Sequence, residues 1–356
     1  MKFWNYNKLD CDKIGNMSQV AGLRRYEFTE GKAKGVEAVE VHTGSGLTFT
    51  VLPGRGMDIA WSEYRGVPLS YMSKTGIVGA PYYESAGMNW LYNFFAGAMT
   101  TCGLLNVGGP EQVTHPVIGK REYGLHGRIT NCAAEQVSLY EEWENGAYVM
   151  RISGIMHEGI LHGEHLTLRR EIETKLGSKE FTIRDTVTNR GTVEQDIMLL
   201  YHINMGYPLL DNGARILANS DGVTPASPLA EADMDKVFSC ENPIQGAEER
   251  CYAHDLHPDK NGKVAVALVN DELELGVAIA YDKQQLPCFN QWKMQSKKEY
   301  VLGLEPCTAL PQGYAKAKEN GTIQTLQAGE SKTLELTYRI LDGKEEIDEF
   351  AASVRG

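Results

Sequence analysis

Two residues far apart in the sequence are suited to exchanging protons with a substrate. His202 lies in YHINMGYPLL (201–210), just after an apolar stretch, and an imidazole titrates near neutral pH. Glu305 ends the apolar run YVLGLE (300–305) and precedes Pro306, which we expect to stop sheet pairing. A carboxyl group at such a partly desolvated strand end has a raised pKa, in the range of a general base. Each residue also has a purely structural interpretation, as a buried spacer or an exposed strand end.

Two arginines beside glycines are candidates for holding a substrate. In GLHGRI (124–129), His126 and Arg128 would point to the same side of an extended chain, and in LPGRGMDIAW (52–61) Arg55 stands between two glycines. Glycine permits close backbone approach by a ligand. A guanidinium can donate two parallel hydrogen bonds to hydroxyl, carboxylate or phosphate groups. A structural turn is the alternative interpretation of both segments.

Three histidines in MHEGILHGEH (156–165) invite a metal interpretation. The spacing of His157, His162 and His165 matches neither HExxH nor the familiar zinc patterns. No GxSxG, GxGxxG or phosphate-binding loop occurs, and none of the seven cysteines belongs to a CxxC motif. We therefore predict no metal and no other cofactor.

Composition and charge favour an ordinary soluble globular protein. The 356 residues are 42% hydrophobic and 23% charged, and 47 acidic against 35 basic residues give a net charge of −12. This excess of negative charge disfavours nucleic acid and anionic membrane as partners, because both bind clustered Lys and Arg. The sequence has no stretch long enough for a transmembrane helix and no apolar N-terminal signal segment. We expect a cytoplasmic location, and the choice between monomer and homodimer stays open.

Alternation of apolar and polar residues is the strongest local pattern, and it indicates strands with one packed and one solvated face. The alternating segments are 164–174, 181–189, 272–282 and 333–341. Helical periodicity is scarce, and its best short candidates are 131–142 and 345–355. We therefore predict a mainly all-β fold, a large antiparallel β-sandwich with few short helices, formed by residues 1–356 as a single domain.

Two segments, 82–111 and 221–250, break the strand pattern. The first is aromatic and rich in glycine, and the second is polar and contains prolines. We expect both to be long loops, and long loops on a rigid sheet often carry function.

Several motifs follow one another in the order of a known family. They are LPGRGMDIAW, NFFAGAMTTCGLLNVGGP, GLHGRITN, DTVTNRG, LYHINMGYPLL and GLEPCT, and together they span nearly the whole chain. This order resembles the aldose 1-epimerase (galactose mutarotase-like) superfamily and, more narrowly, its DUF4432 branch. The resemblance implies a large antiparallel β-sandwich that binds a sugar on a concave sheet face.

The resemblance also implies roles for particular residues. His202 would donate a proton to the ring oxygen of a sugar, and Glu305 would remove the proton from its anomeric hydroxyl. His126 and Arg128 would help to hold the sugar. The implied function is that of a sugar 1-epimerase, or mutarotase, which opens and recloses a hemiacetal by general acid–base catalysis without a cofactor.

Departures from the mutarotase pattern supply further substrate-binding candidates. Asn204 and Tyr207 stand where mutarotases carry an aromatic cluster, and Asp255, in CYAHDL, is the candidate for a sugar-binding aspartate. Trp90, in the 82–111 segment, has a ring that could stack on a sugar; packing in the core is the alternative.

Two other functions remain open for the same sequence. One is a non-catalytic carbohydrate-binding module, which would lack the geometry for proton transfer between His202, Glu305 and one sugar. The other is a different sugar isomerase, epimerase or lyase, because a fold alone does not determine chemistry. In each case the expected partner is a small-molecule carbohydrate, and Arg55 and Arg128 would suit a phosphorylated or acidic one.

Overall fold

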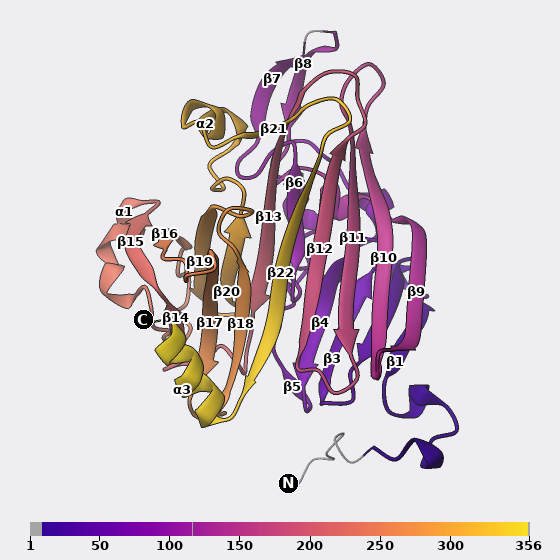
Figure 1. The fold of residues 1–356 in the computed structure, drawn as a ribbon. Coiled ribbons are helices and arrows are strands. Elements are labelled where there is room, and N and C mark those ends of the chain that lie inside the picture. The colour runs from indigo at the N-terminus through magenta and orange to yellow at the C-terminus, as the bar shows by residue number, and fades with distance from the viewer. Residues whose placement is uncertain (1–8, 116, 355–356) are drawn as a thin grey trace.

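An eight-stranded antiparallel sheet forms one layer of the computed structural model, which describes residues 9–115 and 117–354 (Figure 1). In spatial order its strands are β14 (Arg215–Ala218), β17 (Lys263–Asn270), β18 (Leu275–Asp282), β22 (Ser331–Asp342), β12 (Glu180–Asn189), β11 (His165–Lys175), β10 (Ala147–Gly159) and β9 (Glu135–Glu144).

Two further sheets lie behind it in Figure 1. The seven-stranded sheet has the order β15 (Ser220–Pro225), β16 (Arg250–Leu256), β19 (Cys288–Ser296), β20 (Glu299–Cys307), β13 (Gln195–Met205) and β21 (Gln324–Leu326), and β6 (Thr100–Leu104) also pairs with β13. The five-stranded sheet has the order β1 (Gly22–Glu27), β2 (Glu37–His42), β3 (Leu47–Leu52), β4 (Asp58–Tyr64) and β5 (Val67–Pro68). A separate two-stranded sheet pairs β7 (Glu111–His115) with β8 (Gly119–Tyr123).

Helices are short in the described part of the chain. The α-helices are α1 (Pro228–Ala232), α2 (Tyr314–Glu319) and α3 (Lys344–Ser353). The 3-10 turns are η2 (Cys11–Lys13), η3 (Met17–Gln19), η4 (Gly31–Ala33), η5 (Ala80–Tyr82), η6 (Asn89–Tyr92), η7 (Ile129–Asn131) and η8 (Met234–Lys236). The prediction of a mainly β, antiparallel fold with few short helices is confirmed, and among the described residues no helix is long and apolar enough to cross a membrane.

Four local predictions have mixed outcomes. The alternating segments lie largely in β11, β12, β18 and β22, and the predicted C-terminal helix is α3, with Arg355 outside the described residues. The predicted helix at 131–142 is wrong, since most of it belongs to strand β9. The two predicted loops contain regular elements: β6 lies within 82–111, and most of β15 together with α1 lies within 221–250.

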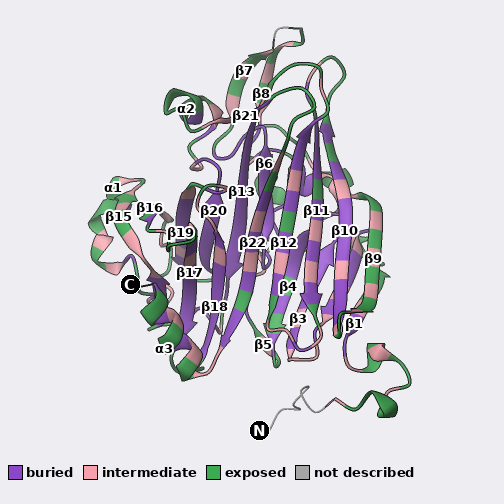
Figure 2. Cartoon of the chain, viewed as in Figure 1, coloured by how far each residue is buried: buried purple, intermediate pink, exposed green. Residues whose placement is uncertain are grey.

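The main core lies between the eight-stranded sheet and the other two sheets. Alternate residues of β13, including Leu199, Tyr201 and Ile203, belong to this core together with Leu168 and Leu336 from the large sheet. The other residues of β13 from Met198 onward face away from it and are buried as well, as the purple colour of β13 in Figure 2 shows. A strand that is covered on both faces can therefore carry buried polar groups on its second face.

Candidate active site

His202 and Glu305 meet on the face of the seven-stranded sheet that points away from the main core. β13 and β20 are antiparallel neighbours, and the register that pairs Ile203 with Leu304 sets His202 opposite Glu305. Nε2 of His202 is 3.2 Å from Oε1 of Glu305, and the two side chains are only 7% and 2% exposed. β20 does not end at Glu305 as expected, because Pro306 still pairs with β19 and the strand continues to Cys307.

Asn204 fixes the orientation of the His202 ring. Its Nδ2 donates hydrogen bonds to the carbonyl oxygens of Gly97 (3.1 Å) and His202 (2.8 Å), so its Oδ1 is the acceptor that faces the ring. Oδ1 lies 2.6 Å from Nδ1 of His202, and this ring nitrogen therefore carries a proton. In the neutral imidazole the lone pair is then on Nε2, the atom that faces Glu305.

The surroundings of Glu305 favour its protonated form. Burial raises the pKa of its carboxyl group to about 8; the hydrogen bond from Asn290 opposes this shift and the negative charge of Glu249 adds to it. Nδ2 of Asn290 donates to Oε2 over 2.6 Å. Oε1, by contrast, makes no well-directed hydrogen bond to any described residue, although His202 lies within ion-pair distance.

The pair holds one proton at neutral pH. Burial lowers the pKa of His202 to about 3, and repulsion from His126 in its protonated form acts in the same direction. The proton therefore resides on Glu305 and belongs to the pair as a unit. Its transfer to Nε2 of His202 converts the two groups into a carboxylate base and an imidazolium acid.

Aromatic side chains surround this pair. The ring centres of Phe94 and Trp292 lie 5.0 and 5.2 Å from that of His202, and Trp90 stacks on Phe94 at 4.5 Å. Nε1 of Trp90 is buried and has no hydrogen-bond partner among the described residues. Trp90 therefore brings both an aromatic face and an unused hydrogen-bond donor to the site.

His126 belongs to the same site. Its ring centre lies 6.1 Å from that of His202 and 4.8 Å from that of Trp90. The backbone N–H of Gly108 donates to its Nδ1 over 3.3 Å, and burial lowers its pKa to about 4. The neutral ring therefore carries its proton on Nε2, which is available to a substrate oxygen.

The expectation that Arg128 points to the same side as His126 is not met, because the segment is a turn. His126 has a φ of 54°, and Arg128 is the residue that precedes η7. Arg128 is exposed, and its side chain makes no hydrogen bond or ion pair to a described residue. Its charge acts on Glu158 and Tyr83. A role for Arg128 in binding stays a prediction.

Arg55 does not face a substrate, which corrects the sequence-based expectation. Its side chain is fully buried. Its guanidinium donates to the carbonyl oxygens of Thr130 (3.0 Å), Asn93 (3.2 Å) and Val78 and lies over the ring of Phe95. The glycines of this motif therefore allow a tight turn around a structural arginine, which is the alternative interpretation of the segment.

Asp255 is also separated from the pair. The register of β16 against β19 places its side chain on the same sheet face as Asn290. Its carboxylate is exposed, however, and forms an ion pair of 2.7 Å with Lys283. The structure thus gives this carboxylate another partner, at the surface.

The three clustered histidines do not form a metal centre. The rings of His157 and His165 are 6.4 Å apart. Across the described ranges, no three His, Cys, Asp or Glu residues are arranged to hold a metal ion.

Two residues of the site, Asn290 and Trp292, were not predicted from the sequence. Both lie on β19, where Asn290 pairs with Glu305 and Trp292 with Gly303 across the strand boundary. The only sequence signal was the spacing of two residues in CFNQWK, which places both side chains on one face of a strand. Assigning that face to the site required the pairing partner.

Comparison with protein-family models shows which family the chain belongs to. A model described as "Domain of unknown function (DUF4432)" matches residues 33–340. The chain belongs to the DUF4432 family. No curated protein matches this DUF4432 sequence.

Solved structures place this DUF4432 protein in the galactose mutarotase-like fold. A Klebsiella pneumoniae subsp. pneumoniae protein titled "putative aldose 1-epimerase" is 26% identical, with a TM-score of 0.87 over 94% of this chain and 88% of its own. A galactose 1-epimerase from Lactobacillus acidophilus is 10% identical, with a TM-score of 0.58 over 91% of this chain and 99% of its own. A galactose mutarotase-like protein from Clostridium acetobutylicum is 11% identical, with a TM-score of 0.61 over 91% of this chain and 99% of its own. At these identities the last two likenesses concern the fold alone.

Proposed function

We propose that this DUF4432 protein is a sugar 1-epimerase that interconverts the anomers of a neutral monosaccharide. The observation that carries the proposal is the buried contact between His202 and Glu305, which share one proton beneath aromatic side chains. A non-catalytic binding module would not need two buried titratable groups whose pKa values are pushed apart.

One proton moves in each direction during the proposed reaction. Glu305, as the carboxylate, removes the proton from the anomeric hydroxyl, and the carbonyl forms at C1 as the bond from C1 to the ring oxygen breaks. His202, as the imidazolium, gives its Nε2 proton to the ring oxygen. The open-chain aldehyde rotates about its C1–C2 bond and recloses by the reverse transfers. His126 and Trp90 supply hydrogen-bond donors that would hold the sugar hydroxyls.

The charges around the pair favour a neutral substrate. Arg55 is buried against carbonyl oxygens, and the neighbouring charge that acts on Glu305 is the negative one of Glu249. A phosphate or carboxylate on the sugar would therefore be repelled at this position. This revises the sequence-based suggestion of a phosphorylated or acidic sugar.

The test is anomer exchange measured by saturation-transfer NMR over a panel of neutral hexoses and pentoses, with their phosphates and uronic acids. We expect at least one neutral sugar to exchange faster than its spontaneous rate and faster than its charged derivatives. Saturable binding of neutral sugars without exchange would instead identify a carbohydrate-binding module, and exchange of the charged sugars alone would refute the substrate class.

We predict that kcat/KM for exchange falls as pH rises above about 8. Because the pKa of Glu305 is raised to about 8, the pair keeps its proton below this pH and loses it above. His202, with a pKa near 3, cannot then supply a proton to the ring oxygen. The decline should approach about tenfold per pH unit, since one proton is lost. Exchange rates between about pH 6 and 10, corrected for the spontaneous reaction, give this profile, and a rate that climbs steadily through the range would contradict the shared proton.

We predict that Gly303→Ala lowers kcat/KM by about 10²-fold, as expected for a catalytic group moved by about 1 Å. A Cβ at this position would overlap Oε1 of Glu305 and come within 3.0 Å of Cβ of Trp292. The matched control is Gly222→Ala on β15 of the same sheet, where a Cβ meets open space. Equal activity of the two variants in the exchange assay would show that the carboxylate position is not critical.

A further inference from the structure

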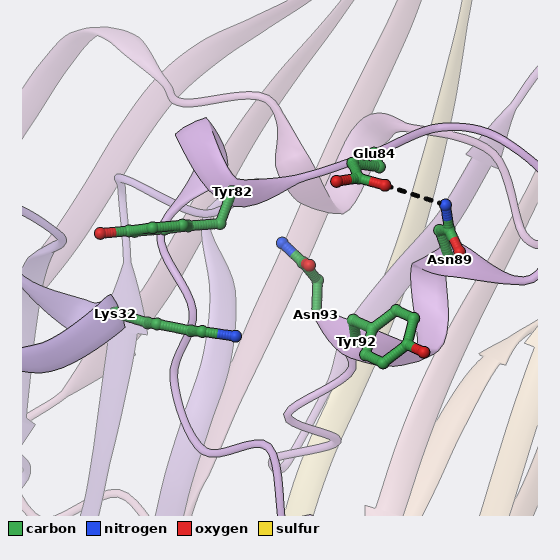
Figure 3. Close-up of a pocket in the computed structure, with 6 residues that line it drawn as sticks. All are labelled: Lys32, Tyr82, Glu84, Asn89, Tyr92 and Asn93. Atoms are coloured by element: carbon green, nitrogen blue, oxygen red, sulfur yellow. Dashed lines mark hydrogen bonds between the residues drawn. The ribbon is translucent and has the colours of Figure 1, made fainter.

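A second concave site is lined by residues of η6 other than Trp90. It is a pocket of about 320 Å³, at the lower end of the size range of small-molecule sites. Its lining residues, shown in Figure 3, are Lys32, Tyr82, Glu84, Asn89, Tyr92 and Asn93. None of them takes part in the interactions of His202 and Glu305 described above.

The floor of this pocket is fixed by buried hydrogen bonds. Asn93 is only 2% exposed, and its Nδ2 donates to Oδ1 of Asn131 over 3.3 Å. Its backbone carbonyl accepts from the buried guanidinium of Arg55 over 3.2 Å. On one wall, the N–H of Gly79 donates to the carbonyl of Lys32 over 2.8 Å, which ties η4 to the start of η5. The pocket is thus built on ordered backbone.

Several polar groups of the lining have no partner in the part of the chain that the structure describes. Nζ of Lys32 and the phenol oxygens of Tyr82 and Tyr92 make no hydrogen bond or ion pair to a described residue. Glu84 accepts one hydrogen bond, from Asn89 over 3.1 Å. In Figure 3 the ends of the Lys32 and Asn93 side chains point into the space between the two tyrosines. Lys32, Tyr82 and Tyr92 are therefore available to a ligand, and the two amides and the carboxylate keep further donor or acceptor positions.

The lining combines features that suit a neutral sugar. Tyr82 and Tyr92 are 54% and 71% exposed, so their ring faces can cover the C–H face of a pyranose. The positive charge of Lys32 is balanced by the negative charge of Glu84, which leaves no net charge to attract an ion. Two amides, an ammonium and a carboxylate can each bond a hydroxyl, because hydroxyls both donate and accept.

We infer that this pocket is a second, non-catalytic binding site for one unit of a neutral carbohydrate. It would operate without proton transfer and therefore independently of the proposed epimerase reaction. Both sites use η6: Trp90 contacts His126, and Asn89 and Tyr92 line the pocket. A sugar held here would lie beside the segment that covers the catalytic pair.

Fluorine NMR of protein labelled with 3-fluorotyrosine tests this inference. The resonances of Tyr82 and Tyr92 are identified by replacing each with phenylalanine, and the protein is titrated with D-glucose, D-galactose, D-mannose and D-xylose. We expect at least one sugar to shift both resonances in a saturable manner, with no saturable shift at Tyr140, an exposed residue on β9. Asn89→Ala should weaken this binding at least tenfold, whereas Leu91→Ala, an exposed neighbour outside the pocket, should leave it unchanged.

The same titration separates this site from the proposed active site. Shifts of Tyr82 and Tyr92 that persist in Glu305→Gln support a second site, whatever that variant does to anomer exchange. Absence of a saturable shift with all four sugars overturns the inference. Shifts produced by glycine, a zwitterion that could span Lys32 and Glu84, but by none of the sugars would overturn it as well.

Discussion

Replacing Glu305 by glutamine is expected to lower the enzyme-catalysed rate of anomer exchange by about 10²–10⁴-fold, the range for loss of a general base. Glutamine has nearly the same shape and can still accept the hydrogen bond that Asn290 donates over 2.6 Å. It cannot take a proton from the anomeric hydroxyl, and it cannot pass one to His202. Saturation-transfer NMR with the best neutral sugar measures the loss.

The thermal stability of this variant distinguishes a lost base from a damaged fold. With its pKa raised to about 8, the carboxyl group of Glu305 is neutral in the folded protein at pH 7, whereas in the unfolded chain it is ionised. The carboxyl group of Glu305 must therefore take up a proton when the chain folds. This uptake lowers the free energy of unfolding progressively as pH rises from the pKa of Glu305 in the unfolded chain to its pKa in the folded protein. The neutral glutamine removes this cost, so we expect a melting temperature at or above that of the wild type.

Glu299→Gln is the matched control for this experiment. Glu299 lies on the same strand, is 36% exposed and pairs with Lys74 at the surface. Its substitution should leave exchange within about twofold, since such surface pairs contribute little. If Glu305→Gln retained exchange to the same degree as this control, Glu305 would not be the base.

The sequence was sufficient to select the two central residues and the fold class. His202 and Glu305 are separated by a large part of the chain, yet both follow apolar runs that form neighbouring strands. Alternation predicted β12 and β22 because each of these strands has a buried and a more exposed face. Such local patterns follow from burial, which acts residue by residue.

The errors arise where a residue's surroundings come from distant parts of the chain. Arg55 looked like a ligand-binding arginine, but Thr130, Val78 and Asn93 satisfy it. The segment around β9 was predicted as a helix, but it forms an edge strand that pairs with β10. An edge strand has a weak pattern of buried and exposed residues, so its sequence alone did not indicate a strand. Asn290 carried no signal of its own and is a site residue only because β19 lies next to β20.

Arg170→Leu is expected to reduce the free energy of unfolding by about 3–5 kcal/mol, as when one partner of a buried ion pair is removed. Arg170 and Asp185 are fully buried and form two hydrogen bonds of 2.8 and 2.6 Å, and Asp58 lies 3.3 Å from the same guanidinium. The substitution would leave Asp185 in the core without its ion-pair partner and Asp58 with only the more distant charge of Arg55. Urea unfolding followed by tryptophan fluorescence measures the difference.

The same ion cluster contacts the strand that carries His202. The hydroxyl of Tyr201 donates to Asp185 over 2.9 Å on the core side of β13, while the next residue, His202, faces the opposite side. Arg184→Leu is the control, because its side chain is 55% exposed and its pair with Glu335 is at the surface; it should cost at most about 1 kcal/mol. If the two variants lost the same free energy of unfolding, the buried cluster would contribute no more to stability than a surface pair. It would then not be a major contact that positions β13.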